Sequence, residues 1–537
     1  MNRIQVFVWT HDGKGKMMHR KWRRVIFCVL LAACIAGCGK TKKESTEQNE
    51  SVVTENIKAN EELAKEYDAV SIILDDAKIT VDGEDISTSE DASVYATNDI
   101  VFYLEGQDFT YGEGTKDDEH SQKEADAHTV VHITKPGNYV VSGSLSKGQI
   151  AVNLGEEAEK NQDAVVTLIL NNADITCEVA PAVIFYEVYE CGSDKEEDAN
   201  SIVDTKAAGA NVIIADGSVN NITGSYVAKI YKSVELNEDK TEITDSEKLH
   251  KYDGAFYSKM SMNINGEEEN TGILNIKAEN EGLDTELHLT INGGNINITS
   301  GNDGINTNED GISVTTINGG NLNIIVDGST GEGDGIDSNG WLVINGGTVT
   351  AYACSFSQDA GIDSDKGIYI NGGTVLATGN MLDEIADSEQ TYLVFSFDSS
   401  VETDSPVLVR NENGEVISEC IPANNFTYLL ISNVDLAEGT YSLWNGDSQM
   451  YVAKTENGMR GGKMPKQGDK ENPQMPDGER PQQPDGEKPQ MPEGERPQMP
   501  GGGRGFGNGN MQNMEWSTEF VITTDGNMFA VSGQPQE

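Results

Sequence analysis

Ile344-Asn345-Gly346-Gly347 is one copy of a phrase that recurs through residues 253–380 and decides the fold. Each copy joins an isoleucine, an asparagine and at least one glycine, and the isoleucines are Ile264, Ile291, Ile317, Ile344 and Ile370. Successive copies are therefore 27, 26, 27 and 26 residues apart. A fixed period of this length, with glycine turns, is typical of a solenoid in which each repeat forms one coil.

Alternation within each repeat predicts which side chains face the core. Leu342 and Ile344 occupy alternate positions, so both face the same side of a strand. Apolar residues alternate again after the turn, and a third apolar position follows at Leu283, Ile305, Ile336 and Ile362. Three short strands per repeat predict an all-β fold, a parallel β-helix. The asparagines of the turn should then form a hydrogen-bonded ladder, and they are Asn265, Asn292, Asn318, Asn345 and Asn371.

A second phrase, Asp334-Gly335-Ile336-Asp337, places oxygen-bearing side chains on the outer face of each coil. Adjacent coils lie about 5 Å apart, and carboxylates at that spacing repel by about 1 kcal/mol or more per pair. A Ca²⁺ ion relieves such repulsion because it accepts carboxylate, amide and backbone oxygens. The alternative is an acidic turn surface without metal. The candidate calcium ligands are Asp284, Asp303, Asn306, Asp334, Asp337, Asp363 and Asp365.

Aromatic residues at outward positions are candidates for carbohydrate binding, because the C–H faces of sugars stack on aromatic rings. The alternation predicts that Trp341, Tyr369 and Tyr352 point outward. The alternative for Trp341 is packing beneath a loop or a cap.

Composition and charge restrict the class of partner. The 537 residues are only 36% hydrophobic, which a solenoid with a thin core tolerates. Their 89 acidic and 38 basic residues give a net charge of −51, which argues against nucleic acid and anionic membrane surfaces as partners. The acidity permits cation binding, or it serves solubility alone.

The N-terminal residues predict export and lipidation. A basic segment, residues 20–24, precedes the short apolar segment 25–36, and Ile35-Ala36-Gly37-Cys38 matches a bacterial lipobox. We expect residues 1–38 to be a lipoprotein signal peptide, with Met17 or Met18 as alternative starts. Cys38 would be the lipidated residue, and the lipid would be the only contact with the membrane.

Changes in composition divide the rest of the chain. We expect a flexible tether over 39–67, the β-helix over 68–385 with loop-like excursions at 191–200 and 231–250, and a β cap over 386–458. Residues 459–515 contain a Pro/Gly/Met-rich tandem and are expected to be disordered, and 516–537 return to complete the cap. Four cysteines lie outside the signal, without metal-ligand spacing. We expect buried free thiols, with a Cys177–Cys191 disulfide as the alternative.

Together, the lipobox, the segment Ile133–Gly143, the Asn-Gly-Gly coils with Gly-Ile-Asp turns and the Pro/Gly/Met-rich segment resemble one family. It comprises bacterial surface lipoproteins that contain a carbohydrate-binding domain. The resemblance implies a right-handed parallel β-helix similar to polysaccharide lyases, bound calcium, and binding of cellulose or acidic, pectate-like glycans. Asn306 replaces Asp in the acidic column, and Asp359 sits one residue earlier than Asp303 and Asp334, so the number of calcium sites stays open.

The leading functional prediction is a surface protein that binds polysaccharide with the help of calcium. A calcium-dependent pectate lyase is the first alternative, and it needs a basic residue near the acids, for which Lys366 and Lys259 are the candidates. A structural adhesin that binds protein is the second.

Overall fold

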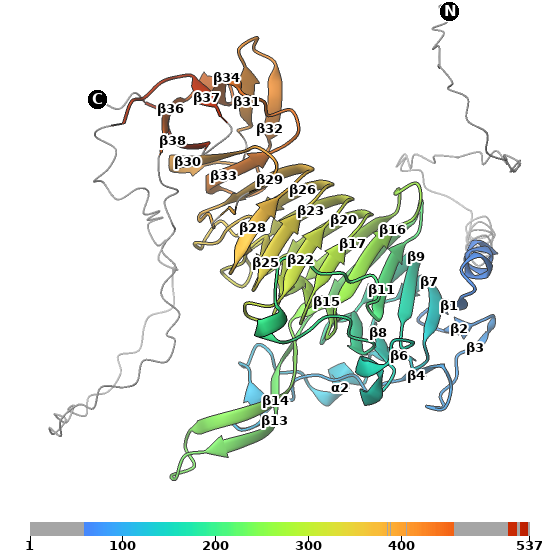
Figure 1. The fold of residues 1–537 in the computed structure, drawn as a ribbon. Helices are drawn as coiled ribbons and strands as arrows, with labels where there is room; N and C mark the ends of the chain where they lie inside the picture. The colour runs from blue at the N-terminus through green and yellow to red at the C-terminus, as the bar shows by residue number, and fades with distance from the viewer. Residues whose placement is uncertain are drawn as a thin grey trace, which may run out of the picture. The chain divides into compact units, whose positions relative to one another are not determined.

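The computed structural model describes residues 58–383, 385–386, 388–403, 405–455, 514–523 and 527–534, and almost all of their regular structure is β (Figure 1). The prediction of an all-β fold is confirmed. Contacts divide the chain into two units, Met1–Thr54 and Glu55–Glu537, and every described residue belongs to the second. Cys38, the signal peptide and nearly all of the Pro/Gly/Met-rich segment lie outside the described residues. No described helix has the length and apolar character needed to cross a membrane.

Most strands belong to three parallel ladders. The first ladder has eight strands that pair in chain order: β7 (Gly137–Leu145), β9 (Val166–Thr176), β11 (Ala210–Ile214), β16 (Met262–Gly266), β19 (Leu289–Ile291), β22 (Val314–Ile317), β25 (Trp341–Ile344) and β28 (Gly367–Ile370). The second follows the end of β9 with β12 (Val219–Gly224), β17 (Ile273–Ala278), β20 (Asn295–Ser300), β23 (Asn321–Val326), β26 (Thr348–Tyr352) and β29 (Thr374–Gly379).

The third ladder completes each repeat. Its strands are β6 (Thr129–Ile133), β8 (Gly148–Asn153), β10 (Val183–Glu187), β15 (Gly254–Ser258), β18 (Glu281–Thr285), β21 (Ile305–Thr307), β24 (Ile336–Ser338) and β27 (Asp363–Ser364). From β16 onward the chain visits the first, second and third ladder in turn and then begins again. Each repeat of 26 or 27 residues therefore adds one strand to each ladder, as the sequence period predicts.

The predicted inward positions form the core between these ladders. Leu342 and Ile344 of β25, Ile336 of β24 and Val349 of β26 are all fully buried in one continuous cluster. Alternate side chains along each strand supply the apolar face, so the repeat buries a thin but uninterrupted core.

The asparagine ladder at the turn is also confirmed. Asn292, Asn318, Asn345 and Asn371 each donate from Nδ2 to the Oδ1 of the preceding asparagine over 2.9–3.0 Å. The glycines make the close stacking possible. Gly347 has φ of +81°, and a Cβ on Gly346 would lie 2.6 Å from the carbonyl oxygen of Asn318.

The two excursions differ from each other. Residues 231–250 were expected to be a loop, and that is wrong. They belong to a hairpin of β13 (Val227–Leu236) and β14 (Ile243–Tyr252), which also pairs with β5 (Gly112–Glu113). Val227, Ala228 and Ile230 at its base are buried, whereas the charged residues farther along the hairpin are mostly exposed. Residues 188–209 are a loop that contains the short helix η2 (Glu196–Asp198).

At the N-terminal end, residues 58–66 are helical, and they precede four short strands that flank the first coils. These are β1 (Val70–Leu74), β2 (Thr80–Val81), β3 (Glu84–Asp85) and β4 (Val94–Thr97). Two short helices follow, α2 (Gln122–Ala125) and η1 (Glu156–Lys160). β1 pairs with β7, the first strand of the first ladder, and β4 pairs with β6, the first strand of the third ladder. These pairings cover the outer edges of both strands.

The C-terminal strands cover the last coil. β30 (Tyr392–Val401) and β33 (Phe426–Ser432) pair with each other, and β33 pairs antiparallel with β29. The remaining strands are β31 (Val407–Asn411), β32 (Val416–Cys420), β34 (Gly439–Asn445), β35 (Ser448–Gln449), β36 (Tyr451–Lys454), β37 (Phe520–Ile522) and β38 (Met528–Ser532). Because β37 pairs with β34 and β38 with β30 and β36, the chain's last described residues complete this unit. Cys177, Cys191, Cys354 and Cys420 are free thiols, and only Cys191 is not fully buried.

Candidate functional site

The predicted acidic column forms on the third ladder. Asp284 of β18 pairs with Asn306 of β21, Asn306 with Asp337 of β24, and Asp337 with Asp363 of β27. Because paired residues of a parallel ladder point to the same face, the four side chains stack coil upon coil. The register of this column is therefore as predicted.

Burial divides the column into two halves. Asp284 is fully buried and Asn306 is 6% exposed, whereas Asp337 and Asp363 are half-buried. Amide groups accompany the buried half, since Asn308 Nδ2 donates to Asp284 Oδ1 over 2.6 Å and Asn306 Nδ2 donates to Glu281 Oε1 over 3.1 Å. Only the half on β24 and β27 is accessible to a ligand.

The acids that precede the glycines bond to the backbone of a neighbouring coil. Asp303 accepts a hydrogen bond from the Asp334 N–H over 2.7 Å, and Asp334 accepts one from the Ala360 N–H over 2.5 Å. Asp359, one position out of step, instead accepts from the Gly333 N–H over 2.6 Å. These carboxyl groups connect coils, a structural role that sequence spacing alone did not reveal.

Proton affinity is high in this region. Burial raises the pKa of Asp303 well above its ordinary value, and the charges of Glu281 and Asp337 raise it further. Burial likewise raises the pKa of Asp334, and Asp303 and Asp363 add to the effect. Crowded carboxylates of this kind hold protons unless a cation neutralises them.

The donor set matches a hard cation in its chemistry, because carboxylate and amide oxygens are the ligands that Ca²⁺ prefers. The side chains are not assembled into a cage, however. Within the described part of the chain, no group of three or more His, Cys, Asp or Glu side chains stands ready to hold a metal ion. Asp303 and Asp334 each direct one oxygen to a backbone N–H group, which leaves a second carboxylate oxygen on each side chain. Asp365 is half-buried, two residues beyond Asp363.

The two candidate bases for a lyase occupy ordinary positions. Lys259 forms an ion pair with Glu187 over 2.6 Å. Lys366 is exposed, and its Cε lies 2.9 Å from where a Cβ on Gly311 would stand, so its side chain extends over the preceding coil. Neither arrangement favours a catalytic role.

The three aromatic candidates separate. Trp341 of β25 and Tyr369 of β28 are half-buried on the outer face of the first ladder, where Trp341 pairs with Gly367 and Val343 with Tyr369. Tyr352 is 7% exposed, packs in the core of the C-terminal unit, and donates from its hydroxyl to the Ile421 carbonyl over 3.0 Å. The prediction that Tyr352 binds carbohydrate is wrong. It points outward from its coil, but the cap covers it.

The acidic and aromatic groups adjoin around one corner. Only Asn339 and Gly340 separate β24 from β25, so Asp337, Asn339 and Trp341 occupy alternate positions along one continuous stretch. We call the outer faces of β24, β25, β27 and β28, with the turns that join them, the acidic–aromatic strip.

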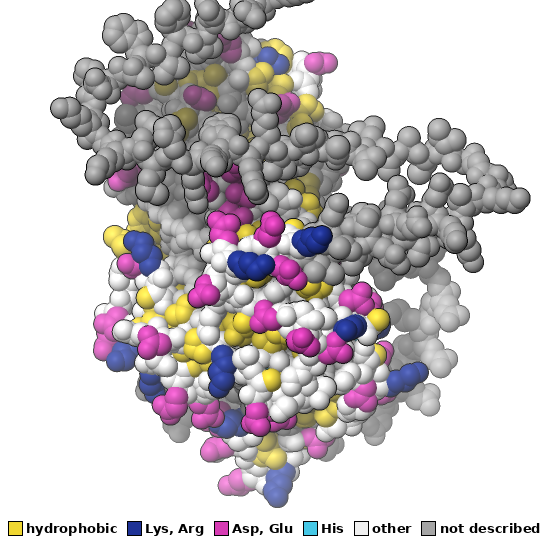
Figure 2. Space-filling model, turned by 90° about the vertical axis from the view of Figure 1, so that its right-hand side faces the viewer, with side chains coloured by type: hydrophobic (Ala, Val, Ile, Leu, Met, Phe, Trp, Pro, Cys, Tyr) yellow, Lys and Arg dark blue, Asp and Glu magenta, His cyan; other side chains and the backbone are white. Residues whose placement is uncertain are grey.

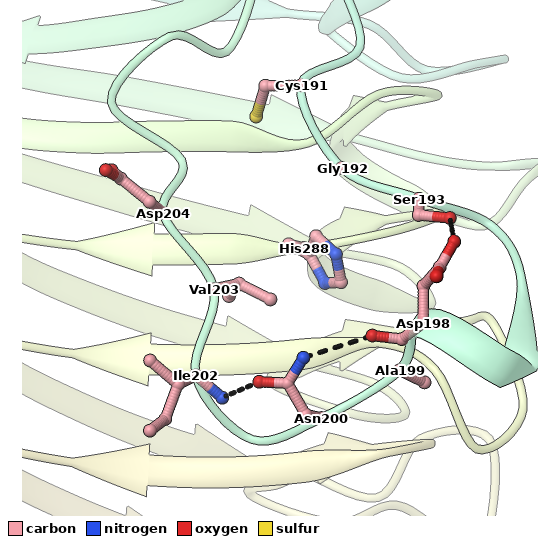
Figure 3. Close-up of a pocket in the computed structure, with 10 residues that line it drawn as sticks. All are labelled: Cys191, Gly192, Ser193, Asp198, Ala199, Asn200, Ile202, Val203, Asp204 and His288. Carbon is pink, nitrogen blue, oxygen red and sulfur yellow. Dashed lines mark hydrogen bonds between the residues drawn. The ribbon is translucent and has the colours of Figure 1, made fainter.

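Sequence reasoning missed a pocket beside this strip. It has a volume of about 200 Å³ and lies between the loop 188–209 and the start of β19 (Figure 3). Its lining residues are Cys191, Gly192, Ser193, Asp198, Ala199, Asn200, Ile202, Val203, Asp204 and His288.

Buried contacts hold the loop on the first ladder. Thr205 is 4% exposed, and its hydroxyl lies 2.7 Å from both Asn263 Oδ1 and Thr290 Oγ1. Asn263 Nδ2 in turn donates to the Thr205 carbonyl over 2.7 Å. Asn263 and Thr290 occupy the same outward column as Val343 and Tyr369, so the loop covers one end of the face on which Trp341 and Tyr369 stand.

His288 forms the floor of the pocket. It is 3% exposed, and its Nδ1 accepts a hydrogen bond from the Val314 N–H over 3.1 Å. A ring nitrogen that accepts carries no proton, so Nε2 bears the proton of the neutral ring. Burial lowers the pKa of His288 to about 4. His288 occupies an outward position of the first ladder, in one column with Ser261, Val314 and Trp341. The alternation of side chains in the sequence could have identified that position.

Charge on the surface is mixed where it can be seen. Figure 2 shows one face of the molecule, on which acidic side chains alternate with lysines and arginines and with small apolar areas.

Comparisons with known proteins identify one family. A family profile described as "Carbohydrate-binding domain-containing protein" matches residues 127–447, which include all three ladders from β6 onward. A search of the curated proteins found no match. A solved structure of a polysaccharide lyase-like protein from C. thermocellum, a gadolinium derivative, is similar at 20% identity and a TM-score of 0.33. That similarity covers 57% of this chain and 90% of the other, and it is too distant to assign a function.

Proposed function

Because the chain belongs to the family of carbohydrate-binding domain-containing proteins, we propose that it binds polysaccharide on the acidic–aromatic strip. The family match over residues 127–447 is the observation that carries this proposal. The strip is the part of the matched region where half-buried aromatic and acidic side chains adjoin.

Two features of the strip suit a glycan chain. Half-buried Trp341 and Tyr369 can stack on the C–H faces of sugar rings, and the neighbouring Asn339 and Asp337 can hydrogen-bond to hydroxyl groups. Parallel strands repeat these positions from coil to coil at about 5 Å, which suits an extended polymer with a repeating structure. Cellulose-like and acidic, pectate-like glycans are the substrate classes we propose.

Calcium is the second part of the proposal. Asp337 and Asp363, with Asp303, Asp334 and Asp365 beside them, would hold Ca²⁺, and Asp284 and Asn306 would support the column from its buried end. The raised pKa values of Asp303 and Asp334 support this assignment, because a cation would replace the protons that these groups otherwise retain. When bound, the ion would supply positive charge between protein carboxylates and the carboxylates of an acidic glycan.

We also propose that the coils wind as a right-handed parallel β-helix, which the three parallel ladders with one strand each per repeat support. The lipobox ending in Cys38 supports export and lipid anchoring at the bacterial cell surface. In that location the strip would meet polysaccharide outside the cell.

Affinity electrophoresis tests the binding proposal. The chain should be retarded in gels that contain hydroxyethylcellulose or polygalacturonate, and Trp341→Ala should remove most of the retardation. Phe356→Ala is the matched control, because Phe356 is an aromatic residue between β26 and β27 that is 78% exposed and lies off the strip. Unchanged mobility of the wild type in every gel would reject the proposal.

The same preparation separates binding from lyase chemistry. Incubation with polygalacturonate and Ca²⁺ should produce no absorbance from unsaturated products. Product formation that disappears in Lys366→Ala would replace the binding proposal with the lyase alternative.

A further inference from the structure

The pocket over His288 is a built site rather than a gap between loops. Figure 3 shows the loop 191–204 curving around the imidazole, with lining residues on every side of it. Internal hydrogen bonds brace the loop, since Ser193 Oγ donates to Asp198 Oδ2 over 2.9 Å and Asn200 Nδ2 donates to the Asp198 carbonyl over 3.0 Å. The Ile202 N–H donates to Asn200 Oδ1 over 3.0 Å. A wall held in this way keeps its shape without a ligand.

His288 presents one donor at the floor of this pocket. Nδ1 of His288 is occupied by the Val314 N–H, and no described residue accepts a hydrogen bond from Nε2. A Cβ on Gly192 would lie 2.8 Å from Nε2, so Gly192 packs closely against this edge of the ring and any side chain there would crowd the donor. A ligand with an acceptor oxygen would give this N–H a partner.

The charges around the pocket select among ligands. Asp198 and Asp204 are the charged residues of the lining, and it contains no lysine or arginine. Carboxylates repel uronates and other anions but accept hydrogen bonds from hydroxyl groups. The imidazole is neutral, so it offers a donor without attracting an anion. The volume of about 200 Å³ is below the range of about 300–1,000 Å³ typical of drug-sized ligands, which leaves space for one sugar ring.

We propose that this pocket binds a single uncharged sugar residue of a glycan, with a sugar oxygen accepting from His288 Nε2. The inference rests on the proposed function and deepens it. The loop stands on the same outward face as Trp341 and Tyr369, so a neutral chain end or branch held at His288 would continue along that face. The pocket would thereby select neutral residues beside a strip that tolerates acidic ones.

Two substitutions at one position test the donor. His288→Asn keeps an acceptor at the position of Nδ1 for the Val314 N–H and removes the donor. His288→Gln places an amide N–H near the position of Nε2. Titration calorimetry with the neutral disaccharides cellobiose, mannobiose, galactobiose and xylobiose should detect binding of at least one to the wild type. His288→Asn should weaken that binding about 10-fold or more, and His288→Gln should weaken it less.

A steric variant provides an independent test. Gly192→Ala should abolish disaccharide binding, because its Cβ would stand 2.7 Å from Cδ2 of His288. Thermal unfolding of each variant establishes that it is folded. The proposal is overturned if none of the four disaccharides binds, if His288→Asn binds as the wild type does, or if glucosamine or trigalacturonate binds in their place.

These outcomes are distinct from failure of the proposed function. Retention by polysaccharide gels with unchanged retention in His288→Asn and Gly192→Ala would reject the pocket and leave the strip intact. Absence of retention in every gel would reject both.

Discussion

The asparagine ladder and the acidic column are both stacks of polar side chains repeated coil by coil, yet their side chains differ in the hydrogen bonds that they can exchange. Each asparagine carries a donor and an acceptor, so Asn318 can donate to Asn292 while accepting from Asn345. Ionised carboxylates only accept, so Asp303 and Asp334, which adjoin the acidic column, depend on backbone N–H groups, protons or a cation. The same spacing therefore produces a structural brace at one corner and a group of carboxylates that responds to pH at another.

The largest expected effect comes from breaking the core that supports both stacks. Ile336→Ala removes a fully buried side chain next to Asp337, and we expect a loss of about 2–5 kcal/mol in the free energy of unfolding. Urea denaturation measures it. Val219→Ala, at a position 46% exposed, should change stability by less than about 0.5 kcal/mol. Equal effects of the two changes would contradict the assignment of the core.

Calcium should stabilise the acidic column and leave the asparagine ladder unaffected. At 100 times its dissociation constant, an ion that binds only the folded chain adds about 2.7 kcal/mol. Thermal unfolding with and without Ca²⁺ should show this increase in the wild type and a much smaller one in Asp337→Asn with Asp363→Asn. A calcium effect that survives the double substitution would move the ion elsewhere.

The pH dependence of stability should reveal the crowding. In the folded state the pKa values of Asp303 and Asp334 are raised, whereas in the unfolded chain both groups ionise near their ordinary pKa. Without calcium, the free energy of unfolding should therefore fall as pH rises above about 4, by about 1.4 kcal/mol per unit of raised pKa, until the folded groups ionise. Asp303→Asn with Asp334→Asn should flatten this decline and make the chain more stable than the wild type at pH 8. A decline that persists in the double variant would place the responsible groups elsewhere.

The smallest expected effect comes from placing a carboxylate, the side chain of the acidic column, in the asparagine ladder. Asn318→Asp puts a carboxylate opposite the Oδ1 of Asn292, so we expect a loss of about 1 kcal/mol at neutral pH. The loss should shrink at pH 3, where a protonated carboxyl group can donate. Asn413→Asp, in an exposed turn, is the control, and an identical result at both positions would show that the ladder contributes nothing.

Sequence alone predicted what depends on local repetition. The alternation of Leu342 and Ile344, the stacking of Asn265 to Asn371 and the register of Asp284 with Asp363 all follow from a period that recurs in the chain. The repeat period did not predict which later segments pack on the outer faces of the strands. Tyr352 points outward as its parity requires, but it is buried because residues about 70 positions later pack on it.

The pocket escaped prediction for the same reason. His288 and the loop 191–204 are far apart in sequence, and the loop interrupts the repeat instead of belonging to it. Contacts such as Thr205 with Thr290 join an insertion to a later coil, and no periodic signal marks them. Raised pKa values likewise depend on burial, which the spacing of acids along the chain does not contain.

The pairing of β38 with β30 and β36 has a consequence for the integrity of the chain. Residue 455 and residue 514 both belong to the C-terminal unit, so the peptide between them begins and ends on the same side of the fold. A protease that cut within residues 456–513 would yield two fragments. The strands of residues 514–534 would remain bound to the larger fragment through their strand pairings, without a covalent bond. The native protein should thus survive as a nicked heterodimer, which separates only on denaturation.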